Sequence, residues 1–238
     1  MDVVIVGGPH SGVGKTLAAE VALRALRGLG YGAIKLTVAD GERDPEHDHG
    51  SSALQLAQAV GVCGRGASCG VCETVSARVP SRLVTSEGAI HKRGTDTCRL
   101  SDAGAVAVAW VISLREAAPD AVSAALAFLE QRGARGAVIE GTTALEWIAP
   151  RASVIVATDP GRKWKEVAVR FIGTCDIPLR NLAPNPPGDE PAPVAFAAAH
   201  PLVCDLSRMD DAGTTTYVAR LRAICAAATT AGVRKSGG

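Results

Sequence analysis

The chain has almost no excess charge of either sign, since 25 Lys and Arg residues are balanced by 24 Asp and Glu residues. Nucleic acids and acidic membrane surfaces attract proteins through clustered basic residues. We therefore expect neither nucleic acid nor a membrane among its partners. Aromatic residues make up only 3% of the sequence, and the basic residues are divided into 6 Lys and 19 Arg. These proportions describe base composition and point to no particular chemistry.

Long hydrophobic runs are also missing. The apolar run within residues 1–8 ends at two glycines and is too short for a signal sequence or a membrane span. The sequence therefore predicts a cytoplasmic protein. Its seven cysteines are an odd number, and in a reducing compartment thiols more often bind metals, react or fill small core positions than form disulfides.

Short apolar runs alternate with stretches of helical periodicity. Strands are expected at residues 2–6, 32–38, 105–112, 136–139, 153–157 and near 201–205, and helices at 15–29, 120–130, 164–171 and 216–228. Near-continuous apolar strands separated by amphipathic helices are typical of a parallel sheet covered on both faces. We predict a single α/β domain over residues 1–238, with a mostly parallel sheet.

Two stretches interrupt this pattern. Residues 39–95 are polar and dotted with glycine, and we interpret residues 41–93 as a Cys/His-bearing segment inserted in the domain. Residues 177–193 contain six prolines and are expected to form a surface loop or linker.

A glycine-rich loop, GGPHSGVGKT, joins the first strand to the first helix. It ends in Gly14-Lys15-Thr16, as a phosphate-binding loop does, although the first glycine of the strict pattern falls on Pro9 and Gly8 lies one residue further out. Backbone N–H groups would point at phosphates, Lys15 would reach the outer phosphates and Thr16 would ligate Mg²⁺. The expected phosphate-binding residues are Gly8, His10, Ser11, Gly12, Val13, Gly14, Lys15 and Thr16. The alternative is a glycine turn with a solvated Lys15.

A carboxylate ends a later apolar strand, in the run GAVIEGT, at Glu140. The carboxyl ends of parallel strands share one edge of the sheet, so Glu140 would lie where a Mg²⁺-bound phosphate lies. Otherwise it is a strand-end glutamate that faces water.

Together these motifs resemble the molybdopterin-guanine dinucleotide biosynthesis protein B family of P-loop NTPases. The similarity covers SGVGKT, Ile34-Lys35 at the end of the second strand, GTDTCRLSDAGAVAVAWVIS and IEG, scattered over about residues 3–142. Thr95 stands where that family has lysine, and the histidine-rich stretch after the second strand is replaced by residues 36–40 and the insertion. The loop and the Glu-Gly strand end are also similar, more distantly, to dethiobiotin synthetase.

The resemblance implies roles for several residues. Lys15 and Thr16 would hold phosphates and Mg²⁺, Lys35 would add charge near the γ-phosphate, and Glu140 would complete the metal site. Asp40 would be a weaker candidate for the water shell of the metal. The implied activity is Mg²⁺-dependent binding and hydrolysis of ATP or GTP in the maturation of a metal, Fe–S or molybdenum cofactor, by a homodimer that serves a partner enzyme.

Other functions stay open at this point. The similarity to dethiobiotin synthetase implies an ATP-dependent ligase or kinase of a small carboxylate, and a third alternative is a nucleotide-binding adaptor without turnover. No N-K-x-D guanine motif is found, so ATP and GTP are not distinguished. No catalytic base is obvious, and we expect slow hydrolysis. Asp96 is either a site residue or an N-terminal helix cap.

Three cysteines fall within ten residues, as C-x5-C-x2-C at Cys63, Cys69 and Cys72. A C-x2-C pair lets both sulfurs meet one metal, and the neighbouring glycines leave N–H groups free to bond sulfur. Cys98 is the expected fourth ligand of an Fe–S cluster or a zinc ion. Other options for that place are His47, His49 and His91. The alternatives are a redox pair or small residues in a glycine loop.

Overall fold

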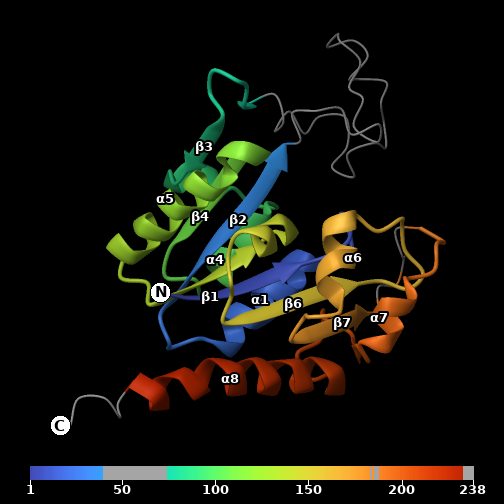
Figure 1. The fold of residues 1–238 in the computed structure, drawn as a ribbon. Coiled ribbons are helices and arrows are strands. Elements are labelled where there is room, and N and C mark those ends of the chain that lie inside the picture. Colours follow the sequence, from blue (N-terminus) through green and yellow to red (C-terminus); the bar gives the residue numbers. More distant parts are fainter. Residues whose placement is uncertain (40–73, 183, 185–187, 233–238) are drawn as a thin grey trace.

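The computed structural model describes residues 1–39, 74–182, 184 and 188–232, which form an eight-stranded, mostly parallel sheet (Figure 1). The strands are β1 (Asp2–Gly7), β2 (Tyr31–Ala39), β3 (Ser81–Val84), β4 (Val108–Leu114), β5 (Gly136–Glu140), β6 (Ala152–Ala157), β7 (Ile177–Asn181) and β8 (Leu202–Cys204). Their order in the sheet is β3-β4-β2-β5-β1-β6-β7-β8, with β3 antiparallel to β4. The predicted α/β class is therefore confirmed.

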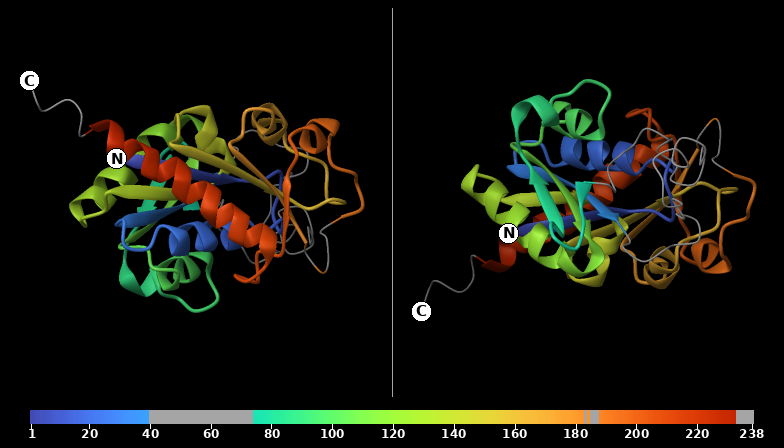
Figure 2. Two further views of the ribbon diagram at one scale, coloured as in Figure 1. Left: turned by 90° about the horizontal axis from the view of Figure 1, so that it is seen from below. Right: turned by 90° about the horizontal axis from the view of Figure 1, so that it is seen from above.

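Helices cover both faces of this sheet. They are α1 (Lys15–Ala25), α3 (Glu87–Ile90), α4 (Asp96–Asp102), α5 (Ala118–Gln131), α6 (Glu166–Ile172), α7 (Val194–Ala198) and α8 (Ala212–Gly232), with 3-10 turns η3 (Arg115–Ala117) and η4 (Thr142–Glu146). The helices α5, α6 and α7 pack on one face, and α1, α3, α4 and α8 on the other (Figure 2). Among the residues described, no helix is long and apolar enough to cross a bilayer.

The central strands are buried on both sides, as their near-continuous apolar sequences require. In β1, Val4 and Val6 pack toward α1 and α8, whereas Val3 and Ile5 pack toward α5 and α6. Each of these side chains is less than 9% exposed. Because β1 lies between β5 and β6, its carboxyl end opens onto a loop that is enclosed by strands on both sides.

The expectation of a loop over residues 177–193 is wrong for its first part. Residues Ile177–Asn181 form β7, a parallel strand paired with both β6 and β8. Proline usually marks a turn or a sheet edge, because it cannot donate to a ladder. Pro178 nevertheless pairs in register with Ile155 inside the sheet. The strand has only five residues, and the prolines that follow it make the whole stretch resemble a loop in sequence.

The structure describes the segment 41–93 from residue 74 onward. That part is joined to the sheet, because β3 is the edge strand beside β4. It leads through α3 into α4, which packs against α1. The cysteines of the C-x5-C-x2-C run lie outside the described residues.

Candidate functional site

The loop after β1 is shaped by a close approach of backbones. A Cβ atom on Gly8 would lie 2.6 Å from the carbonyl oxygen of Val156 in β6, so only glycine fits. The hydroxyl of Thr142 accepts the N–H of Gly8 at 2.9 Å and donates to the Gly8 carbonyl at 2.8 Å. Gly8 therefore takes a fixed place between two neighbouring strand ends, even though Pro9 occupies the usual glycine position.

The other end of the loop is fixed by Gly14 and by a residue from β7. Gly14 has φ 102°, a left-handed conformation that favours glycine, and it is the N-cap of α1. The side-chain amide of Asn181 donates to the carbonyl of Val13 at 3.1 Å, and its oxygen accepts the N–H of Leu206 at 3.4 Å. The amide thus ties the loop to the chain beyond β8.

His10 links the middle of the loop to the segment that follows β6. Its Nε2 accepts the backbone N–H of Arg162 at 3.1 Å, so the ring proton lies on Nδ1, which donates to the carbonyl of Ser11 at 3.0 Å. Burial lowers the pKa of His10 below its usual value, and the nearby charges of Lys15, Arg162 and Lys165 lower it further. The imidazole is therefore neutral at pH 7.

Lys15 and Thr16 begin α1, where the backbone N–H groups have no helical partners and attract anions. The ammonium of Lys15 donates to the carbonyl of His10 at 2.5 Å, which curls the side chain over the loop. The hydroxyl of Thr16 donates to Oε1 of Glu140 at 3.1 Å. The first turn of α1 thus presents a cation and a hydroxyl to the same cavity.

Glu140 occupies the centre of the site because of its register. It ends β5 and is paired with Val6 of β1 on one side and Lys35 of β2 on the other. Glu140 is only 2% exposed, and its Oε1 lies 2.5 Å from the Lys35 ammonium. Its Oε2 is buried and has no hydrogen-bond partner within the described part of the chain. A buried carboxylate oxygen without a partner is costly, so this atom is suited to a cation or an ordered water.

The ammonium of Lys35 bridges two carboxylates, since it also lies 2.7 Å from Oδ2 of Asp96. Burial of Asp96 opposes its ionisation, but the charge and hydrogen bond of Lys35, together with Thr16 and Arg99, outweigh burial and lower the pKa of Asp96 below its usual value. The cap of α4 is Thr95, whose hydroxyl accepts the N–H of Cys98 at 3.3 Å. Asp96 is therefore not the helix cap, and its carboxylate is turned toward the site.

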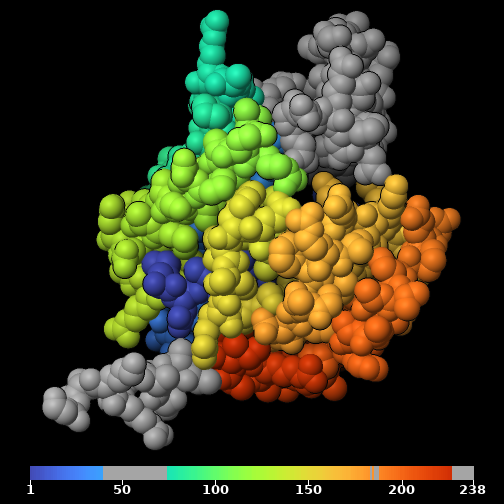
Figure 3. Space-filling view, viewed as in Figure 1, coloured from blue at the N-terminus to red at the C-terminus, as the bar shows by residue number. Residues whose placement is uncertain are grey.

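These residues line one cavity of about 850 Å³ at the carboxyl edge of the sheet. Its lining includes the loop residues, the ends of β2 and β5, Arg115, Glu146 and parts of the segment 163–170. Figure 3 shows the residues around η4 (yellow) and those of α6 (light orange) side by side on one face of the molecule. Cavities at the carboxyl ends of parallel strands are where α/β proteins usually bind ligands.

The structure brings most of the expected site residues to this cavity. Those that line it are Gly8, His10, Ser11, Gly12, Gly14, Lys15, Thr16, Lys35 and Glu140, while Val13 is buried beneath the loop. Asp40, His47, His49, Cys63, Cys69 and Cys72 lie outside the described residues. Cys98 is described: its thiol lies 3.7 Å from Asp102, and burial and that carboxylate raise the pKa of the thiol. The described residues contain no group of three or more His, Cys, Asp or Glu side chains arranged for a metal.

Comparisons of the chain with protein-family models, curated proteins and solved structures found no match. Its function therefore has to be inferred from its own residues and their arrangement.

Sequence reasoning missed four residues of the site. Thr142 follows the Glu-Gly strand end and Asn181 lies in the proline-rich stretch, and neither belongs to a motif that predicts a site. Lys163 lies just before the helix expected at 164–171 and Lys165 lies within it, neither with an expected functional role, yet both line the cavity. The scarcity of lysine could have pointed to these two residues, because the chain has only six lysines and four of them line this cavity.

The His10 contacts predict a pH-dependent stability. Since the pKa of His10 is lower in the folded protein than its usual value, the unfolded chain binds more protons, and stability falls as the pH drops below about 6.5. His10→Gln keeps an acceptor for the Arg162 N–H but does not titrate. We expect the urea midpoint to fall less between pH 7.5 and pH 5.5 in this variant than in the wild type. Equal falls in both proteins would contradict the role given to His10.

Proposed function

We propose that this protein binds a nucleoside triphosphate with Mg²⁺ and slowly hydrolyses it. The observation that carries this proposal is the buried Glu140 carboxylate beside the glycine loop, with Oε1 held by Thr16 and Lys35 and Oε2 without a partner. Lysine at the start of α1 supplies charge for the outer phosphates.

The residues present fit a bound Mg²⁺ ion. The ion prefers oxygen ligands and keeps several waters, so one protein hydroxyl, one carboxylate and phosphate oxygens suffice. Thr16 and Glu140 would hold it, through the hydroxyl and the unpartnered carboxylate oxygen. When bound, Mg²⁺ would neutralise charge on the phosphates during phosphoryl transfer.

The chain's own groups would do the rest by position and charge. Backbone N–H groups between Gly12 and Thr16 would bind phosphate oxygens, and the Lys15 ammonium would leave the His10 carbonyl to reach them. Lys35 would pair with Glu140 and Asp96 and add positive charge beside the phosphates. His10 would hold the loop closed against the segment after β6.

The wider role rests on the sequence resemblance. We infer that hydrolysis of ATP or GTP serves the maturation of a metal-containing cofactor, with a partner enzyme and a homodimeric state, as in the molybdopterin-guanine dinucleotide protein B family. The cysteine run would bind an Fe–S cluster or zinc in this role, with Cys98 as a further ligand.

Lys15→Ala is expected to weaken nucleotide binding at least tenfold, because a charge-assisted contact to phosphate contributes about 1.5–3 kcal/mol. Calorimetric titration with ATP and with GTP measures the loss of affinity and shows whether the protein prefers adenine or guanine. Lys92→Ala is the matched control, since Lys92 is exposed and lies outside the cavity. Near-normal affinity in the Lys15 variant would remove the phosphate-loop assignment.

Glu140→Gln tests the metal site separately. The wild type should bind nucleotide more tightly with Mg²⁺ than with a chelator, and this difference should shrink about tenfold or more in the variant. Glu146→Gln is the control, because Glu146 also lines the cavity but is paired with Arg115 and Arg170. A Glu140 variant with an undiminished Mg²⁺ effect would show that the ion is held elsewhere.

The cysteine proposal is tested by metal content. We expect protein purified without oxygen to contain zinc or iron, and Cys69→Ser with Cys72→Ser to lower the metal per chain while the far-ultraviolet circular dichroism stays unchanged. Elemental analysis of both proteins provides the measurement. Equal metal content, or none in the wild type, would refute a site at these cysteines.

A further inference from the structure

A second part of the cavity lining, the wall beside α6, has its own set of charged side chains. Lys163 and Lys165 come from the segment between β6 and α6, Arg170 from α6 and Arg115 from η3, with Glu146 of η4 between the arginines. The proposed phosphate site uses none of these residues.

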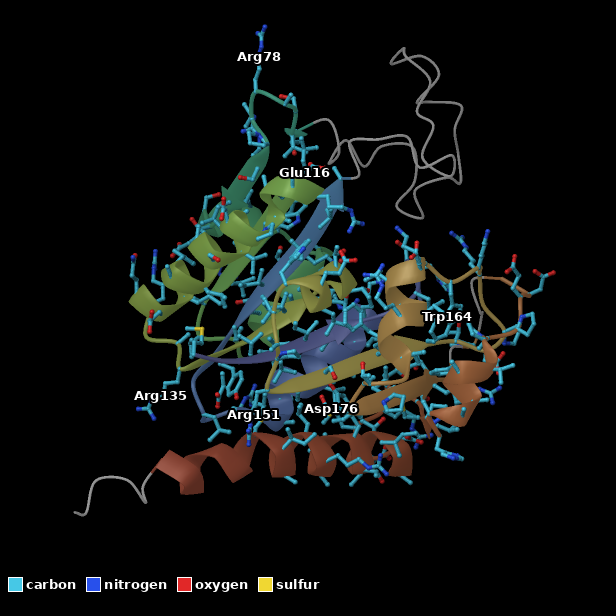
Figure 4. All side chains as sticks on the ribbon, viewed as in Figure 1. Arg78, Glu116, Arg135, Arg151, Trp164 and Asp176 are labelled. Carbon is cyan, nitrogen blue, oxygen red and sulfur yellow. The ribbon has the colours of Figure 1, made fainter. Side chains whose placement is uncertain are left out.

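The backbone that carries the two lysines is anchored to the rest of the fold. Trp164, which is labelled beside α6 in Figure 4, is only 9% exposed and packs against Phe196, with ring centroids 5.2 Å apart. Lys165 has an extended backbone and donates its N–H to the carbonyl of Pro9 at 3.4 Å. Lys163 and Lys165 are both exposed, and both line the cavity, as Trp164 does.

The arginines of this wall are compensated, and the lysines are not. Arg115 lies 2.6 Å from Glu146, and Arg170 lies 3.2 Å from Glu146 and 3.4 Å from Glu166. Two cations thus face two carboxylates. Neither Lys163 nor Lys165 has a carboxylate within 4.0 Å among the residues that the structure describes. Counted over the described residues alone, this wall has four cationic side chains and two carboxylates, an excess of two positive charges.

The choice of lysine is itself informative. The chain has 19 arginines and 6 lysines, so its basic positions are filled mainly by arginine. Four of the six lysines nevertheless line this cavity: Lys15, Lys35, Lys163 and Lys165. A lysine ammonium is a compact charge with rotatable donors, whereas the arginine fork is planar and fixed.

We propose that the wall formed by Lys163, Lys165 and Arg170 binds a small dianionic molecule, which is a second substrate alongside the nucleotide. This inference rests on the proposed function, which places the triphosphate and its Mg²⁺ ion beside Lys15. Two lysine charges match the two negative charges of a phosphate monoester or of a dicarboxylate.

The test uses the full chain saturated with Mg²⁺ and a non-hydrolysable triphosphate. Glycerol phosphate and succinate are titrated separately by calorimetry, and one of them should bind with an affinity that falls as salt rises. Lys163→Gln with Lys165→Gln should weaken this binding at least about tenfold and leave nucleotide affinity unchanged. Lys92→Gln, an exposed lysine outside the cavity, should behave as the wild type. Glycerol phosphate binding assigns a phosphate ester, and succinate binding a dicarboxylate.

Three results would overturn the proposal: neither dianion binds the wild type, the double variant binds the dianion as well as the wild type, or it loses nucleotide affinity instead. The third result would place both lysines in the nucleotide site. The dianion titrations are repeated without nucleotide in Lys15→Ala, where the glycine loop no longer competes for anions. If the wild type binds no nucleotide but this variant still binds a dianion, the proposed function is wrong and the lysine site stands. If neither nucleotide nor dianion binds, both proposals are wrong.

Discussion

The site depends on one buried ion pair, between Glu140 and Lys35. The two residues are register partners on adjacent parallel strands, so the sheet itself sets their separation. A charge as buried as Glu140 is tolerated only when it is paired, and loss of one partner typically costs about 3–5 kcal/mol. Lys35 in turn holds Asp96 at the start of α4, and Thr16 reaches Glu140 from the start of α1. Residues of β2 and α1 therefore meet the Glu140 carboxylate directly, and α4 is tied to it through Lys35.

The glycine loop is positioned from outside by side chains that belong to neighbouring elements. Thr142 fixes its first glycine, Asn181 its last turn, and the Arg162 backbone its middle through His10. Such a loop has its backbone N–H groups arranged before a ligand arrives, which lowers the entropy lost on binding. Each of these contacts comes from the carboxyl end of a strand or the segment just after it, because parallel strands deliver their ends to one edge.

Charge divides the cavity into two halves. Near the loop, Lys35 faces the carboxylates of Glu140 and Asp96, whereas the wall beside α6 keeps two lysines without a carboxylate partner in the described residues. This asymmetry is the basis on which we propose a second small ligand beside the nucleotide.

The sequence by itself determined the alternation of strands and helices, the glycine loop and the carboxylate at the end of β5, because periodicity and local turn chemistry are local properties. It did not predict β7, because the prolines within residues 177–193 indicated a loop and the strand itself has only five residues. Nor did it bring Thr142, Asn181 or Lys163 to the loop and the cavity. Those contacts were decided by the tertiary structure, because they depend on strand order and register, which place residues more than 100 positions apart at one edge of the sheet.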